Sequence, residues 1–439
     1  MKKLVLILSV VALTTTSTFA QKVNVDALKA KIAKSDETIA NPKKNTKAAT
    51  WLSRGEMFTS VAEANCNSIF VGMLESMVTE AIGKPTNASS IPVEVINGKE
   101  LKKFEYPTVD IYFSNDATSK VVYWIEKSTV DENAIDKAVE AYLKAYELDN
   151  GLKEKVGQGF TEIVTYLSVN AQNLYDAGEF KKAYKGFQKA GEIGLQNPNG
   201  VCEGSEALLY YAVVAAAQSE EYSDAASMIK TLVDKGVEQN GDIYLYAGIV
   251  FEKLEDKDNA KKYMELGIKK YLDNQRLLQQ YITFSLQNNA GVEAIMPYIQ
   301  EAQAKDPDNF VFVLSEGIVY NQAKDYDKAI AAYEKAAKMN PENWGTFYNL
   351  GFAYRAKAIE INNELSTVDY TNTKLIEQLR ADFYAAMIGA IEPFEKAYAL
   401  DSTDKQVVEV LKSIFFTLRD QSDEMMAGYN KYDELFKSM

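Results

Sequence analysis

The feature that most limits how this chain can fold is a pattern that returns every 34 residues. Gly317 and Gly351 are 34 residues apart, and the unit that begins at the first of them continues with Ala329, Tyr333, Ala336 and Pro341. Small residues at this spacing let two helices cross closely, while the aromatic residues fill the space beside the crossing. Each helix pair then has an apolar stripe that it cannot bury alone. The pattern therefore predicts an all-α fold in which neighbouring helix pairs stack.

Weaker copies of the same unit occur along most of the chain. They lie at 174–190, 212–229, 244–264 and 275–307, and a closing pair of helices follows at 407–418 and 425–436. In the unit at 275–307, Pro297 is expected to kink the second helix, because proline removes one backbone hydrogen bond. We therefore expect roughly seven helix pairs, more than the about three that a repeat array needs for stability.

On these residues the sequence resembles the tetratricopeptide repeat (TPR) family, whose glycine, tyrosine, alanine and proline positions recur at this period. The resemblance implies a superhelix that holds a protein or peptide and has no catalytic residues. In this family the first helix of each pair lines a concave groove. Carried over to this sequence, the peptide-binding residues of the groove are Ser168, Gln172, Tyr210, Val214, Leu245, Ile249, Leu314, Ile318, Asn321, Tyr348, Asn349, Phe352 and Arg355.

These groove residues are mainly aromatic and aliphatic, with scattered amides and one arginine. Such a surface suits an extended or helical peptide that is anchored by apolar side chains. The alternative is that tight winding of the repeat buries some of these residues against each other. Both interpretations remain open on the sequence.

The first repeat is interrupted. Its first helix is expected around Trp51 to Phe58, but the matching second helix, at 138–145, comes only after a long insertion. A short helix at 70–84, alternating apolar residues and an Asn97-Gly98 turn signal predict a small α+β module there, with four strands. The helix, its Gly83-Lys84-Pro85 end and the strands around 104–125 resemble small outer-membrane assembly lipoproteins of the SmpA/OmlA type, over about residues 70–126. The alternative is a module that only braces the first repeats.

A second interruption separates Tyr354 from Ala390, which would be nine residues apart in an ordinary unit. Two lengthened helices joined by a polar turn are expected to form an extended helical hairpin at about 355–390. Pro393 is expected to bend the returning helix. Protrusions on a rigid scaffold often make contacts with partners.

The composition excludes several classes of function. The chain has no histidine, which excludes histidine nucleophile systems and histidine metal sites. A formal net charge of −14 argues against a nucleic-acid partner, because binding phosphates requires a basic surface. No residue pattern predicts a metal or a cofactor. Cys66 and Cys202 could form a disulfide, although two separate buried thiols are the commoner outcome.

The N-terminus is typical of a secretory signal. Lys2 and Lys3 precede an apolar run over residues 4–13, and Thr18 and Ala20 stand at the positions that a signal peptidase requires. The run is shorter than the ~20 residues that span a bilayer. We therefore expect an exported protein of the periplasm, with no transmembrane anchor after cleavage.

The expected organisation is a signal peptide at 1–20, an N-terminal helix and the first repeat helix at 21–62, the α+β insertion at 63–130 and the repeat array at 131–439. The expected function is a non-catalytic scaffold that binds a protein or peptide in the cell envelope of a Gram-negative bacterium. The alternative function is a structural subunit of an envelope, outer-membrane assembly or secretion machine.

Overall fold

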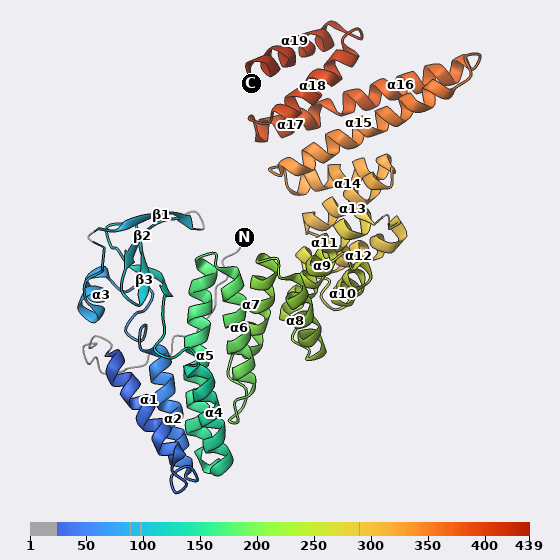
Figure 1. Cartoon of the computed structure of the whole chain (residues 1–439). Coiled ribbons are helices and arrows are strands. Elements are labelled where there is room, and N and C mark those ends of the chain that lie inside the picture. The colour runs from blue at the N-terminus through green and yellow to red at the C-terminus, as the bar shows by residue number, and fades with distance from the viewer. Residues whose placement is uncertain (1–23, 88, 97–98, 289) are drawn as a thin grey trace. The chain divides into compact units, whose positions relative to one another are not determined.

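The structure is a computed structural model that describes residues 24–87, 89–96, 99–288 and 290–439 (Figure 1). The expected signal peptide and the Asn97-Gly98 turn lie outside the described residues. The chain divides into two compact units, residues 1–239 (unit 1) and 240–439 (unit 2). At the boundary, Gln239, Asn240 and Gly241 all have positive φ, so the backbone leaves the helical path for three successive residues. The repeat pattern did not predict this division.

Unit 1 contains the first repeats. Its α-helices are α1 (Val25–Ala40), α2 (Ala48–Glu63), α3 (Glu75–Ile82), α4 (Ala134–Leu148), α5 (Lys153–Asp176), α6 (Phe180–Leu195), α7 (Ser205–Gln218) and α8 (Tyr222–Asp234), with a short 3-10 helix at Asn150–Leu152. Helices α2 and α4 lie side by side although the insertion separates them in the sequence (Figure 1). This confirms the split first repeat.

One tyrosine closes the split repeat. Tyr142 of α4 is 1% exposed, and a Cβ added at Gly55 of α2 would lie 2.6 Å from its ring. A Cβ at Gly159 of α5 would also clash with this ring. Glycine at both positions therefore lets α2 and α5 both pack closely against this side chain of α4.

The inserted module occupies residues 64–133. Its strands β1 (Ile91–Ile96), β2 (Lys99–Glu105), β3 (Val109–Ser114) and β4 (Val121–Glu126) form an antiparallel sheet in the order β1-β2-β3-β4. Ile111, Phe113 and Trp124 share a buried core with Val78 of α3, because alternate residues of each strand point to one face. The predicted α+β insertion is therefore present.

Unit 2 contains the later repeats. Its α-helices are α9 (Asp242–Lys253), α10 (Lys257–Lys270), α11 (Gln275–Gln287), α12 (Val292–Lys305), α13 (Phe310–Gln322), α14 (Tyr326–Met339), α15 (Trp344–Thr367), α16 (Thr373–Gly389), α17 (Ile391–Leu400), α18 (Lys405–Leu418) and α19 (Asp423–Ser438). Most begin at a side chain that accepts a hydrogen bond from a backbone N–H of the first turn, as N-cap residues do. These caps are Asp256, Asn274, Asn309, Asp325, Asn343, Asn372, Asp404 and Ser422. The helix α12 runs through Pro297.

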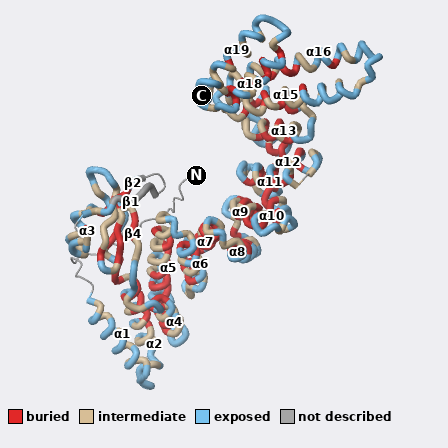
Figure 2. The backbone as a smooth tube through the Cα atoms, turned by 45° about the horizontal axis from the view of Figure 1, so that its top comes forward, coloured by how far each residue is buried: buried red, intermediate tan, exposed pale blue. Residues whose placement is uncertain are grey.

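Helices α15 and α16 form a long hairpin whose far part consists largely of exposed residues (Figures 1 and 2). The returning helix does not merely bend near Pro393, as the sequence predicted. Instead α16 ends at Gly389 and α17 begins at Ile391. Proline lacks an N–H, and its ring clashes with the carbonyl four residues earlier, which here belongs to Gly389. The chain therefore starts a new helix with Pro393 in its first turn.

Turns between paired helices use left-handed backbone conformations. Gly178 has φ 78°, but Lys324 has φ 60° at the corresponding turn between α13 and α14. A residue with a side chain destabilises the folded state by about 1–2 kcal/mol in this conformation. Glycine avoids that cost, but it gives the unfolded chain more conformational entropy, which offsets part of the gain. We expect Lys324→Gly to raise the free energy of unfolding by about 0.5 to 1 kcal/mol in urea titrations. A loss of stability would contradict this account of the turn.

The two cysteines are not bonded to each other in the structure. Both are free and buried. Cys66 lies in the core of the inserted module, and Cys202 accepts a hydrogen bond from Asn197 Nδ2 at 3.2 Å. Burial and the nearby charge of Glu126 raise the pKa of the Cys66 thiol. This thiol is therefore held in its unreactive, protonated form.

Candidate functional site

Four of the predicted groove residues are buried in the protein. Ser168 is 1% exposed, Val214 2%, Leu245 4% and Tyr210 9%. For these positions the structure shows the self-packing alternative, because neighbouring helices cover their side chains. The prediction that these four residues bind a peptide is therefore wrong, and they are packing residues.

In unit 1 the inserted module covers part of α5, the helix that carries two predicted groove residues. The Tyr166 hydroxyl donates to Glu126 Oε2 at 2.7 Å, and Asn65 Nδ2 donates to Glu126 Oε1 at 2.9 Å. Val169 packs against the core of the module. Gln172 of α5 is half-buried, and its amide donates to Asp176 at 3.0 Å. The module therefore covers α5 around Tyr166 and Val169, next to the predicted groove residue Ser168, while Thr161 and Thr165 on another face of the helix stay exposed.

The remaining predicted residues are half-buried and lie in unit 2. Ile249 is on α9, apart from a group on α13 and α15. We call that group the groove surface, which comprises Leu314, Ile318, Asn321, Tyr348, Asn349, Phe352 and Arg355. Leu314 and Ile318 pack at the edge of the core between α13, α14 and α15. The groove surface is thus the part of the predicted groove that stays accessible.

Aromatic residues form a stripe along α15. Trp344, Tyr348 and Phe352 follow each other at four-residue spacing, which places them on one face of the helix. Their ring centroids are 4.5 Å apart for the first pair and 4.6 Å for the second. Phe394 of α17 supports the stripe from behind, with its centroid 5.2 Å from that of Phe352. Gly351 makes room for this support, since a Cβ there would lie 2.7 Å from the Phe394 ring.

Arg355 ends the stripe with a positive charge. It is half-buried, and it forms no ion pair or hydrogen bond with any side chain in the part of the chain that the structure describes. On α13, the groove-surface residue Asn321 has a buried amide oxygen without a hydrogen-bond partner among the described residues. An arginine whose donors are free can bind a carboxylate through two parallel hydrogen bonds.

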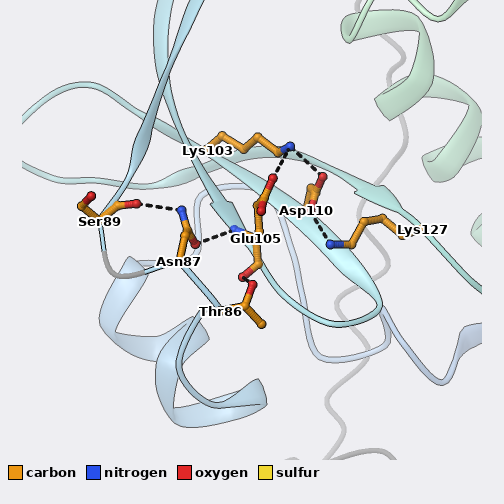
Figure 3. A network of polar contacts seen from close by, with 7 residues as sticks. All are labelled: Thr86, Asn87, Ser89, Lys103, Glu105, Asp110 and Lys127. Carbon is orange, nitrogen blue, oxygen red and sulfur yellow. Dashed lines mark hydrogen bonds and ion pairs between the residues drawn. The ribbon is translucent and has the colours of Figure 1, made fainter.

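The module carries a conspicuous cluster of charges, but these charges are paired with each other (Figure 3). Lys103 Nζ lies 2.9 Å from both Glu105 and Asp110, and Lys127 Nζ lies 2.8 Å from Asp110. Burial lowers the pKa of Lys103, but its hydrogen bonds to the two carboxylates raise it more. The cluster joins β2, β3 and the end of β4, so its role is to hold the sheet together.

Three acidic residues of unit 1 are half-buried and have raised pKa values. Burial and the charge of Glu162 raise the pKa of Glu63 to about 7, and burial also raises the pKa of Glu126 and Asp176. Among the described residues, no group of three or more His, Cys, Asp or Glu side chains is placed to hold a metal ion. The raised pKa values make the folding stability of unit 1 depend on pH, because each carboxyl holds its proton more tightly in the folded chain than in the unfolded chain.

A second accessible surface was missed by the sequence analysis. A hollow of about 530 Å³ lies between α14, α15 and α17, and we call it the α14–α17 hollow. Its lining comprises Glu334, Ala337, Lys338, Phe347, Leu350, Tyr354, Gly389, Glu392, Pro393 and Lys396. It lies on another face of α15, because Phe347 and Tyr354 are about 100° around the helix from the aromatic stripe. The sequence signals near it were the insertion between Tyr354 and Ala390 and the proline at position 393.

The helices of the described ranges include none with the length and apolar character needed to cross a membrane.

Part of the chain matches a known protein family. Residues 317–363 match the family model described as TPR repeat. The curated protein "BBSome complex member bbs-4" from Caenorhabditis elegans is 21% identical over 227 residues, which cover 52% of this chain and 46% of that protein. The chain thus matches about half the length of this relative.

Two solved structures are similar to parts of this chain. A tetratricopeptide repeat protein from Parabacteroides merdae is 14% identical, with a TM-score of 0.38, and the match covers 58% of this chain and 99% of that one. YrrB, described as a TPR protein with an unusual peptide-binding site, is 18% identical with a TM-score of 0.32, and the match covers 48% of this chain and 97% of YrrB.

Proposed function

We propose that the chain is a scaffold for protein–protein interaction, and that it binds a peptide segment of its partner on the groove surface. Residues 317–363, which include most of this surface, match the TPR repeat model. The observation that carries this proposal is the position of Arg355 at the end of the aromatic stripe. Its guanidinium has no partner among the described side chains, while Tyr348 and Phe352 beside it stay partly accessible. Apolar anchors next to one unpaired cation suit a peptide with apolar side chains and one carboxylate.

The scaffold acts without catalysis in this proposal. It holds its partner reversibly, and no described residue is assigned to a chemical step. We further propose that the protein works in the periplasm of a Gram-negative bacterium. This second part depends on the signal-like sequence of residues 1–20 and on the resemblance of residues 70–126 to outer-membrane assembly lipoproteins.

The test uses a peptide library displayed on phage and selected on the full chain. Selected peptides are expected to contain apolar residues and an Asp or Glu, and Arg355→Glu is expected to weaken their binding about tenfold to a hundredfold in fluorescence anisotropy. Arg355 is the right position because its change leaves the core intact, whereas Tyr348 and Phe352 also support Phe394.

The matched control is Lys335→Glu, which reverses an exposed charge on α14 outside both surfaces. It should leave the affinity unchanged. If Arg355→Glu binds the selected peptides as tightly as the control does, the groove surface is not their binding site.

A second candidate function is a structural subunit of a larger assembly in the envelope. The observation in its favour is the similarity to bbs-4, which is described as a member of a complex. In that case the groove surface would be covered permanently in the native complex. The unassembled chain would then be rare in fractionated cells, and the partner segment on the groove surface would not exchange with added free peptide.

A further inference from the structure

The α14–α17 hollow has an apolar floor. Leu350 is 5% exposed at its base, while Phe347 and Tyr354 are half-buried and Pro393 is buried. Gly389 lets the backbone come close at one end, because a Cβ there would lie 2.7 Å from the Tyr354 ring. These side chains of α15 and α17 form a small apolar floor, able to bind an apolar side chain of a partner, inside a lining that is otherwise largely polar.

The charges around this floor are separated by sign. At the Tyr354 end, the tyrosine hydroxyl donates to Glu334 Oε1 at 2.9 Å, and Glu392 is close enough to contribute to a raised tyrosine pKa. At the other end, Lys396 Nζ lies 6.0 Å from the centre of the Phe347 ring. Lys338 follows Glu334 by one helical turn on α14, in the direction of this second end. The hollow is therefore acidic at one end and basic at the other.

These four charges are available to a partner. Within the described ranges, Glu334, Lys338, Glu392 and Lys396 are exposed and form no ion pair. The hollow of about 610 Å³ between α4 and α6 differs in this respect, because Lys189 of α6 is paired with Asp136 of α4 at 2.8 Å. That hollow has no aromatic floor and already satisfies part of its own charge.

The distance between the two ends sets the size of the occupant. Phe347 and Tyr354 are seven residues apart on one helix, which corresponds to about 10 Å. An extended peptide covers that distance with about three residues. We propose that the α14–α17 hollow binds an extended segment of a partner polypeptide in which an apolar side chain lies between an acidic and a basic residue, with the acidic residue at the Phe347 end. This surface is separate from the groove surface, so the proposal does not depend on peptide binding there.

The test uses four end-blocked peptides and the full chain, with binding measured by calorimetry. Their central sequences are Asp-Leu-Phe-Lys, Asp-Leu-Phe-Asp, Lys-Leu-Phe-Lys and Ser-Leu-Phe-Ser, each flanked by Gly-Ser. Two exposed charge pairs favour the dipolar peptide over the other three by about fivefold to tenfold at low salt. The preference should fall as salt rises, because such pairs are screened.

Charge variants decide the orientation. Replacing both basic residues, Lys338→Glu with Lys396→Glu, makes the hollow acidic throughout and should transfer the preference to the Lys-Leu-Phe-Lys peptide. Replacing Glu334→Lys with Glu392→Lys should transfer it to the Asp-Leu-Phe-Asp peptide. All four positions are exposed, so the variants should fold. The Glu334→Lys pair also loses the hydrogen bond from Tyr354 and should melt only a few degrees lower than the unchanged protein.

Three results would overturn the proposal. Equal affinity for the four peptides would show that the charges do not select the partner, and no measurable binding would show that the hollow is not a peptide site. Self-association that the same charge variants abolish, measured by sedimentation, would assign the hollow to a second copy of this chain. Arg355→Glu should leave the dipolar peptide's affinity unchanged, so failure here is distinguishable from failure at the groove surface.

Discussion

Tyr142→Ala is expected to lower the free energy of unfolding of unit 1 by about 3–5 kcal/mol, as removal of a buried aromatic ring does. The ring lies where α2, α4 and α5 meet, and Gly55 and Gly159 leave no side chain that could fill the space. A loss of this size is expected because the ring joins the two halves of the first repeat, α2 and α4, which the insertion separates in the sequence. Urea titration followed by circular dichroism measures it.

The matched control is Tyr142→Phe. It removes only the hydroxyl, which lies 3.3 Å from Thr59 Oγ1, and should cost about 1 kcal/mol or less. A change of similar size for both variants would mean that the ring does not join the three helices. Because Tyr142 lies in unit 1, an unfolding transition assigned to unit 2 should not move.

Glu63→Gln is expected to stabilise the protein at pH 8, by up to about 3 kcal/mol, and to have little effect near pH 4. Burial and Glu162 raise the folded-state pKa of this carboxyl from 4.5 to about 7. Below pH 4.5 the group is protonated in both the folded and the unfolded chain, so it does not lower the free energy of unfolding. As the pH rises from 4.5 through 7, the unfolded chain loses the proton first, and the stability of the folded chain falls.

Two further acidic residues test the cause of this effect. Glu162→Gln removes the neighbouring charge and should give a smaller gain at pH 8, because burial is the larger cause. Glu80→Gln, at an exposed position on α3, should change nothing. Since Glu126 and Asp176 also have raised pKa values, the difference between variant and unchanged protein, rather than the whole pH curve, isolates Glu63. An equal effect of Glu63→Gln at pH 4 and pH 8 would contradict the raised pKa.

The repeat period predicted the helices because each small residue has a fixed role at a helix crossing. Gly351 and Gly317 accept the rings of Phe394 and Tyr333, which is why their spacing carries information about the partner helix. The split first repeat could be recognised in the same way from Gly55 and Tyr142. These contacts are between residues of one repeat or its neighbour, so sequence spacing describes them well.

The candidate site could be predicted only in part, because exposure depends on what covers a residue. Tyr210 and Tyr348 are both aromatic residues in the first helix of a pair, yet the first is buried and the second is half-buried. The inserted module covers part of α5, and nothing in the spacing of the repeat indicates where an insertion will pack. The α14–α17 hollow likewise depends on where α16 ends and α17 begins, which follows from the clash of Pro393 with the preceding turn.

The central claim is that the groove surface on α13 and α15 binds a peptide. Hydroxyl-radical footprinting of the full chain, with and without a phage-selected peptide, tests it most directly, because it reads the accessibility of individual side chains. The account predicts that the peptide protects Tyr348 and Phe352, while Tyr370, which is 85% exposed at the tip of the hairpin, reacts equally in both samples. Protection of Tyr370 with none at Tyr348 and Phe352 would contradict the claim and place the binding site on the hairpin.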